Sequence, residues 1–257
     1  MKKICLLSVC IFIFFVSVAE VYADWNSEYS PLYPSFQVLV SVATGYVNNT
    51  SMNDLTKRRA RKDADKLNHP FKRNQVESSP AHHFPLGLDF ELRFFYDTFG
   101  LGLQAGYHAV RAKTDVVNSV TDSVETTTTS YLSVKPVVAT LYYRIELGSI
   151  YQFLLVGAGT GYYFGRIDLE HEGSILASSE YFGGSYKAQT QKGYHFLIEY
   201  DIYSSSSLTF FAGLKARYLK FDEFKKGGNA LKVYGTDKNV KASLTGIACY
   251  AGLGLSF

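Results

Sequence analysis

Cysteine is nearly absent from the chain, which excludes a protein held together by disulfides. Of three cysteines among 257 residues, Cys5 and Cys10 lie in an amino-terminal hydrophobic run typical of a removable signal. The mature chain would keep only Cys249, which cannot form an intramolecular disulfide. Tryptophan (1) and methionine (2) are also scarce, whereas tyrosine (20), phenylalanine (19) and glycine (21) are abundant. This composition favours strands over helices and predicts an all-β fold.

A strong net charge is also lacking. The formal net charge of +3 is too small to indicate nucleic-acid binding by the chain as a whole. The sequence contains no glycine-rich phosphate loop, nucleophile elbow or zinc motif. It therefore predicts no catalytic residue, no cofactor and no metal.

The amino terminus is typical of a secretory signal peptide. Lys2 and Lys3 precede an apolar run at positions 4–18, and a signal peptidase could cleave after Ala23. About 15 apolar residues fall short of the roughly 20 that a helix needs to span a bilayer. We expect residues 1–23 to be removed, residues 24–35 to form a lead-in on the periplasmic side, and residues 36–257 to form one folded domain.

Eight stretches alternate apolar and polar residues, as half-buried strands do. They cover residues 36–46, 84–95, 101–109, 129–145, 154–165, 194–202, 208–218 and 244–257. Three short turns and four long polar loops connect them, and a hairpin hidden in the first or fourth loop would raise the number to ten. Pro136 cannot donate a ladder hydrogen bond, so we expect a bulge there that shifts the alternation.

The apolar faces of these strands must point outward. Eight strands enclose a space just wide enough for side chains, and rows of Phe, Leu and Tyr from most strands would not fit there. In water such an outer face would cost on the order of 100 kcal/mol, far beyond the net stability of a domain. The sequence therefore predicts an eight-stranded antiparallel up-and-down transmembrane β-barrel, with short turns facing the periplasm and long loops outside.

Two segments carry a family resemblance. The last strand, Leu244–Phe257, alternates in character and ends on phenylalanine, and Leu141-Tyr142-Tyr143-Arg144 is followed by a short turn and Val156-Gly157-Ala158-Gly159. Both resemble small bacterial outer-membrane barrels of the OmpW-like or OmpA-like kind. The resemblance implies the bacterial outer membrane as the location, outer-membrane lipid and lipopolysaccharide as neighbours, and recognition of the carboxy-terminal strand by the barrel-assembly machinery. It supplies no catalytic residues.

Charged residues on the inward faces form one candidate site. They are Asp89, Glu91, Arg93, Lys135, Arg144, Glu199, Asp201, Lys215 and Arg217. Because acids and bases mix and eight strands leave little bore, they favour a closed, salt-bridged interior. A porin-like channel for small or hydrophobic solutes is the alternative. A lipid A-modifying enzyme is a third reading, although inward-facing His108 and His195 have no serine two residues away on their own faces.

The first long loop is the other candidate site. Its basic residues are Lys57, Arg58, Arg59, Arg61 and Lys62, and residues 54–67 could form a short helix because they are rich in helix formers. These cations could contact an external anionic ligand, or they could simply be solvated. His69, His82 and His83 follow without the spacing of a metal site. The predicted function is an integral outer-membrane protein with a structural or surface-interaction role.

Overall fold

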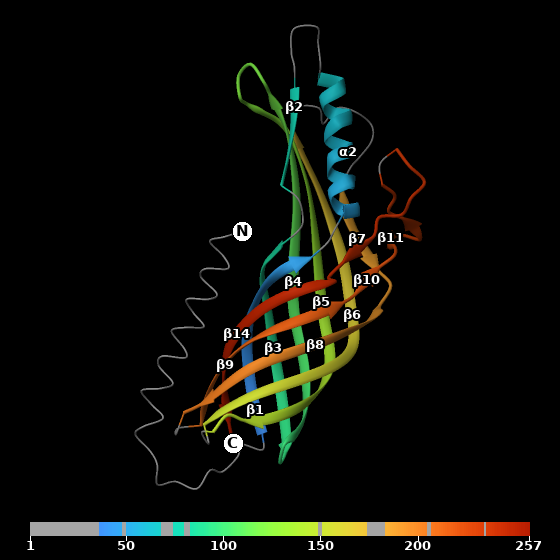
Figure 1. The fold of residues 1–257 in the computed structure, drawn as a ribbon. Coiled ribbons are helices and arrows are strands. Elements are labelled where there is room, and N and C mark those ends of the chain that lie inside the picture. Colours follow the sequence, from blue (N-terminus) through green and yellow to red (C-terminus); the bar gives the residue numbers. More distant parts are fainter. Residues whose placement is uncertain are drawn as a thin grey trace.

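Eight antiparallel strands close into a barrel in a computed structural model of the chain (Figure 1). The structure describes residues 36–47, 50–67, 74–79, 83–148, 151–173, 183–204, 207–233 and 235–257. The barrel strands, in their order around the ring, are β1 (Phe36–Val47), β3 (His83–Tyr96), β4 (Phe99–Asn118), β5 (Val124–Glu146), β6 (Gln152–Gly173), β8 (Gln191–Tyr203), β9 (Leu208–Tyr218) and β14 (Gly246–Ser256). The predicted fold class is confirmed, with eight strands rather than ten in the ring. The predicted signal peptide and lead-in lie outside the described residues.

The first and last strands seal the ring. β1 pairs with β14 from Gln37 opposite Ser256 to Val47 opposite Gly246. At the end of this seam, the Phe36 amide donates to the Phe257 carbonyl (3.2 Å) and the Phe257 amide donates to the Phe36 carbonyl (2.8 Å). Closure satisfies the backbone groups that an open sheet edge would leave unpaired in lipid.

Side chains alternate between the interior and the outer face, as predicted. In β3, Arg93 is fully buried while its neighbour Phe94 is 52% exposed. Every strand of the ring contributes exposed apolar side chains, among them Val40, Val42, Leu88, Phe90, Leu101, Leu103, Val137, Leu141, Tyr162, Phe164, Phe196, Ile198, Leu214, Leu253 and Leu255. This apolar belt suits lipid, and the charged residues of the same strands are enclosed.

Aromatic side chains mark both ends of the apolar belt. Near the short turns, the Phe36 ring lies 4.7 Å from the Phe94 ring and 6.0 Å from the Phe257 ring, measured between centroids. Toward the opposite end, tyrosines from four strands are exposed: Tyr46, Tyr107, Tyr194 and Tyr218. Such positions are typical of the two membrane interfaces.

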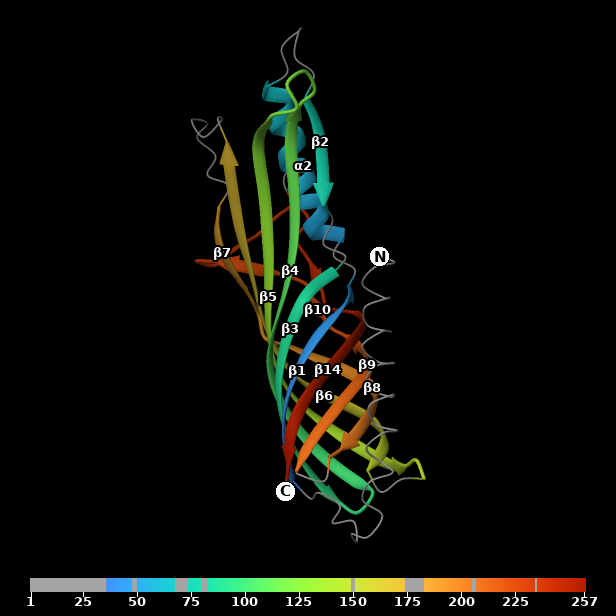
Figure 2. The same cartoon turned by 90° about the vertical axis from the view of Figure 1, so that its left-hand side faces the viewer.

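Three strands continue far beyond the barrel, on the side away from the short turns (Figure 2). β4, β5 and β6 are 20, 23 and 22 residues long. The polar segments between the predicted strands, expected as loops at 111–128 and 166–191, are therefore strand over much of their described length. The alternation persists, since Val110, Ala112 and Val116 stay buried. What changes is the outer face, which becomes polar where the sheet leaves lipid. Because both faces then lack the apolar–polar contrast of a lipid-facing strand, the sequence pattern did not indicate strands here.

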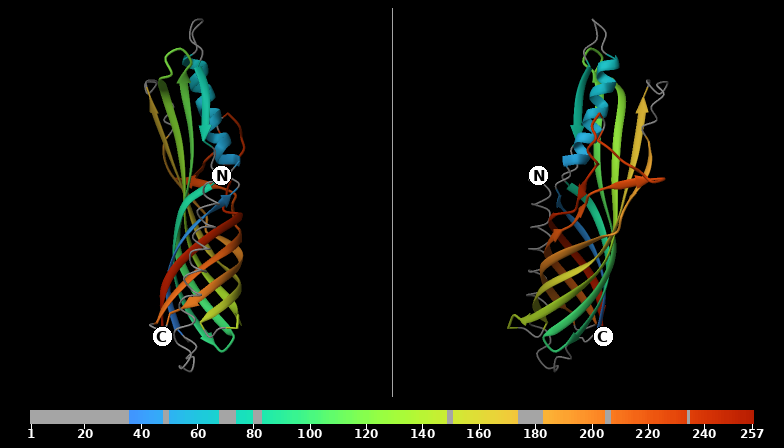
Figure 3. Two further views of the ribbon diagram at one scale, coloured as in Figure 1. Left: turned by 60° about the vertical axis from the view of Figure 1, so that its left-hand side comes forward. Right: turned by 90° about the vertical axis from the view of Figure 1, so that its right-hand side faces the viewer.

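The first loop folds against this extension. It contains α2 (Thr50–Leu67) and β2 (Asn74–Ser79), and β2 pairs with β4. Figure 3 shows α2 alongside the extended strands from two directions. A stripe at helical spacing is buried toward the sheet: Met52, Leu55, Ala60 and Ala64. The short helix suspected from the sequence is present and begins earlier than expected. Within the described ranges, no helix is long and apolar enough to cross a membrane.

Pro136 produces no bulge. Val134, Pro136 and Val138 pair with β6 in one unbroken register. The pairing with β4 is interrupted beside Pro136, between the Ala105–Val137 and His108–Val134 pairs, but resumes in the same register. The missing N–H is thus absorbed locally in the ladder with β4, and the alternation of β5 is unchanged.

The fourth loop packs into the outward end of the barrel. Its short strands are β10 (Lys220–Phe221), β11 (Phe224–Lys226), β12 (Asn229–Ala230) and β13 (Ala242–Ser243), and β11 also pairs with β7 (Gly184–Ala188). Phe221, Phe224 and Val240 are fully buried in one core with interior residues such as Ala43 and Tyr163. Apolar packing therefore continues from this loop into the barrel.

Candidate functional site

Arg93 lies at the centre of a charged network inside the barrel. Its Nη2 donates to Glu199 Oε2 and to Glu91 Oε2, both at 3.0 Å, and its Nη1 donates to Glu199 Oε1. Nη1 also lies 3.7 Å from Asp201 Oδ2. One guanidinium is thus shared by three carboxylates from two strands. Such a buried charge is tolerable only when its partners are this close.

Aromatic rings surround the other interior cations. The Arg144 guanidinium carbon lies 3.7 Å from the centroid of the Phe95 ring. The Lys215 ammonium lies 5.0 Å from the Tyr250 ring and donates to Gln104 Oε1 at 2.9 Å. Ring faces and an amide oxygen therefore stabilise cations that burial would otherwise penalise.

A second ion cluster joins β3, β4 and β9. His108 Nε2 lies 3.0 Å from Asp89 Oδ1, and Arg217 Nη2 donates to Asp89 Oδ2 at 3.5 Å. Eight of the nine predicted network residues are buried inside the barrel, four acids and four bases: Asp89, Glu91, Glu199, Asp201, Arg93, Arg144, Lys215 and Arg217. The equal numbers make the interior formally neutral.

Lys135 is the exception, and its assignment to the interior network is wrong. It is exposed on the outer face of β5, directly before the buried Pro136. The expected bulge would have let residues 135 and 144 share a face. With no shift in register, residues separated by an odd number of positions must point to opposite sides.

Glycines make the room that this network needs. A Cβ on Gly106 would lie 2.0 Å from Asp89 Oδ1, and one on Gly102 would lie 2.3 Å from Glu91 Oε1. Both glycines are on the inward face of β4, where Gly106 lies opposite Asp89 and Gly102 lies opposite Arg93, one inward position from Glu91. The absence of side chains at these two positions of β4 thus leaves the space that the carboxylates occupy.

The two inward histidines are also enclosed. His108 is bound to Asp89, and His195 Nε2 forms a 2.8 Å hydrogen bond with Thr140 Oγ1. Both imidazoles are buried inside the ring, away from the surface at which an acyl chain would arrive. His69 and His82, and the side chain of His83, lie outside the described residues. In the part of the chain that is described, no group of three or more His, Cys, Asp or Glu side chains could hold a metal ion.

The predicted basic loop is the outer face of α2. Arg58 and Arg61 are exposed, and Lys57 and Lys62 are partly exposed. Arg59 is buried instead, with its Nε 3.3 Å from Asp63 Oδ2, because it lies on the side of the helix that packs on the sheet. Including Arg59 in the exposed basic set was therefore wrong.

A pocket of about 510 Å³ adjoins this basic face, between α2 and the fourth loop. It is lined by Ser51, Asp54, Arg58, Val233, Thr236, Asp237, Lys238, Asn239 and Lys241. The sequence reading missed Lys238 and Lys241. Their loop also carries more bases than acids, but nothing local to either loop indicates that the two meet.

Comparisons with known proteins find likenesses among solved structures. No protein-family model matches the sequence, and no curated protein matches it significantly. Neisserial surface protein A matches with 14% identity over 87% of this chain and 97% of its own, at a TM-score of 0.45. OprG from Pseudomonas aeruginosa matches with 11% identity over 87% of this chain and 96% of its own, at a TM-score of 0.45. Ail of Yersinia pestis, solved in complex with the heparin analogue sucrose octasulfate, matches with 10% identity over 87% and 99%, at 0.39.

Because their TM-scores are below 0.5, these structures give no independent support for the fold assignment. The closed ring, the apolar belt and the enclosed charges carry the assignment. The chain is an eight-stranded antiparallel β-barrel of the outer-membrane type.

Proposed function

We propose that this barrel anchors a basic binding surface outside a bacterial outer membrane, where the surface holds an anionic ligand. The observation that carries the proposal is the outer face of α2. Its exposed or partly exposed charges are Lys57, Arg58, Arg61, Lys62 and Lys66 against Asp54 and Asp65. Lys238 and Lys241 add two cations at the adjoining pocket. A cationic surface of this kind attracts polyanions, with an affinity that falls as salt rises.

The docking of α2 supports a surface of fixed shape. Thr114 Oγ1 of β4 donates a 3.0 Å hydrogen bond to Thr56 Oγ1, and Ala60 and Ala64 pack against Val116. Held on the sheet, the helix presents its cations without the entropy cost of ordering a free loop on binding. Ail was solved with a sulfated sugar, and immobilised heparin is a suitable probe here.

The test uses the full-length barrel in detergent on immobilised heparin. A triple variant, Arg58→Gln, Arg61→Gln and Lys62→Gln, is expected to elute at markedly lower salt than the wild type. The matched control neutralises three basic residues elsewhere, Lys113, Lys220 and Lys225, and is expected to elute close to the wild type. Arg59 is left unchanged because it is buried. Equal elution of the triple variant and the wild type would reject the proposal.

We also propose that the interior neither conducts nor catalyses. Paired acids and bases from facing strands occupy the barrel, and the fourth loop packs Phe221 and Phe224 into the same core. The alternative predicted from the sequence is a channel for small solutes. Planar-bilayer recordings are expected to show no conductance steps, and regular steps would favour the channel. For catalysis, lipid A is expected to keep its acyl groups on co-incubation.

A further inference from the structure

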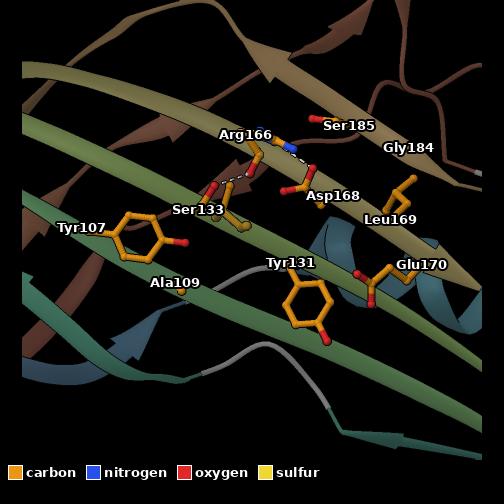
Figure 4. Close-up of a pocket in the computed structure, with 11 residues that line it drawn as sticks. Tyr107, Ala109, Tyr131, Ser133, Arg166, Asp168, Leu169, Glu170, Gly184 and Ser185 are labelled. Carbon is orange, nitrogen blue, oxygen red and sulfur yellow. Dashed lines mark hydrogen bonds and ion pairs between the residues drawn. The ribbon is translucent and has the colours of Figure 1, made fainter.

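A shallow pocket lies on the outer face of the sheet, on the opposite side from α2 (Figure 4). Its volume is about 600 Å³. Tyr107 and Tyr131 contribute aromatic rings, and Ser133 and Ser185 contribute hydroxyls. Between them, Arg166 Nε donates to Asp168 Oδ1 at 2.8 Å. Aromatic faces together with a planar ion pair and hydroxyls suit a sugar, which has both an apolar face and a ring of hydroxyls.

The pocket begins where the apolar belt ends. Along the outer face of β6, Tyr162 (53% exposed) and Phe164 (48%) are followed two residues later by Arg166. Lys135 of β5 lies opposite Phe164. A ligand seated here would therefore touch lipid-facing rings at one end and cations at the other.

Four neighbouring strands place a cation at this boundary. Lys187 of β7 lies opposite Arg166, and Lys192 of β8 lies opposite Tyr162, with its ammonium 5.9 Å from the Tyr162 ring. Residues paired across strands have Cβ atoms about 4.5–5.5 Å apart. Lys135, Arg166, Lys187 and Lys192 thus form a cationic arc around the pocket. The lining itself contains Arg166 and two acids, Asp168, which is paired with Arg166, and Glu170.

We propose that this pocket binds the phosphorylated sugar headgroup of a glycolipid in the outer leaflet. The sugar rests on the ring of Tyr131. The Arg111 guanidinium carbon lies 5.3 Å from the centroid of the same ring. The phosphates lie against Lys135 and Lys187, and the acyl chains run down the belt past Phe164 and Val137. Continuity with the belt favours a lipid over a soluble sugar phosphate. The site is independent of the polyanion surface, since α2 packs on the other face of the same sheet.

The test is native mass spectrometry of the full-length barrel in detergent, titrated with lipopolysaccharide that lacks its O-antigen chains. The wild type is expected to retain one copy. Lys135→Gln and Lys187→Gln are each expected to weaken retention about fivefold, which is the usual worth of one basic residue near a charged lipid surface. Lys66→Gln, exposed on α2 at the other face of the sheet, is the matched control and is expected to change retention little.

A variant that is expected to bind more tightly separates loss of binding from misfolding. Asp168→Asn removes the acid that offsets Arg166, so retention is expected to rise, and a damaged protein would not bind more tightly. Chemically dephosphorylated lipopolysaccharide is expected to bind more weakly than the intact form.

Three results would each overturn the proposal. The first is equal retention by wild type and the Lys135→Gln, Lys187→Gln double variant. The second is an equal loss in Lys66→Gln. The third is displacement of the glycolipid by millimolar inorganic phosphate, which would indicate a site for free phosphate instead.

Discussion

Arg93 and Glu199 face each other across the barrel, 106 positions apart in the sequence, and are joined by two hydrogen bonds. Their strands, β3 and β8, lie on opposite sides of the eight-stranded ring. The pair therefore bridges the interior directly, and Glu91 and Asp201 add carboxylates on either side. Because the bridge forms only when the ring is closed in register, it links barrel closure to charge neutralisation.

The stability losses from removing the two partners of this bridge should not add. Arg93→Leu or Glu199→Leu leaves a buried charge without its main partner, and each is expected to lower the free energy of unfolding by about 3–5 kcal/mol. The double variant is expected to lose less than the sum of the two. Urea unfolding in detergent micelles measures all three, and strictly additive losses would show that the pair is not coupled.

The alternation of the strands was predictable because lipid and a charged interior impose opposite demands on neighbouring residues. It assigned Asp89, Glu91 and Arg93 to the inside without any knowledge of their partners. Alternation gives the face of a residue but not its contact across the ring, so the Arg93–Glu199 bridge required the closed structure. The assignment of Lys135 to the interior was wrong because it depended on a bulge that did not form.

The extended strands were missed, and the start of α2 was misplaced, for a different reason. Above the membrane the outer face of β4 carries Arg111, Lys113 and Asp115, so the contrast that identified strands in lipid disappears there. The buried stripe of α2 includes Arg59 and Asp63 among its small and apolar residues, which blurs its helical period. Nothing in the sequence alone brings Lys238 and Lys241 to this helix.

Filling the space beside Asp89 should destabilise the barrel. In Gly106→Val, the new Cβ would meet Asp89 Oδ1 at 2.0 Å and the Leu88 carbonyl oxygen at 2.7 Å. The second contact is with backbone, which cannot rotate away, so the expected loss is at least about 1–3 kcal/mol. Ala105→Val, one residue earlier on the lipid-facing side, is the control and is expected to be nearly neutral. Similar unfolding midpoints for the two variants would contradict the packing described for Gly106.

A charge placed under α2 should release the helix and leave the barrel intact. Ala60 is fully buried against Val116, so Ala60→Glu would bury a carboxylate without a partner. Trypsin is then expected to cleave within α2 much faster than in the wild type, because the helix is rich in lysine and arginine. Gel migration before and after boiling should stay unchanged, since the ring of strands does not depend on the helix. Lys66→Glu, on the exposed side, is the control, and equal protection of both variants would place the docking face elsewhere.

The docking of α2 should also weaken in mild acid. His171 lies on β6 beyond Tyr163, the last β6 residue paired with β8, and is therefore above the membrane-spanning part. Its Nδ1 is 3.1 Å from Thr128 Oγ1 and its Nε2 is 3.7 Å from Asp63 Oδ2 of α2. Burial lowers the pKa of His171 below its ordinary value of 6.5, and Arg59 lowers it further, whereas Asp63 opposes the shift.

The direction of the pH effect follows from this lowered pKa. When α2 undocks, His171 returns to its ordinary pKa and binds a proton more readily, so docking is most stable above about pH 6.5 and is lost progressively as the pH falls below that value. Trypsin cleavage of α2 at pH 5.5, relative to pH 7.5, is therefore expected to increase more in the wild type than in His171→Gln. Dividing the cleavage rate of the wild type by that of His171→Gln at each pH cancels the pH dependence of trypsin itself. A ratio that stays constant between the two pH values would show that His171 does not control the docking of α2.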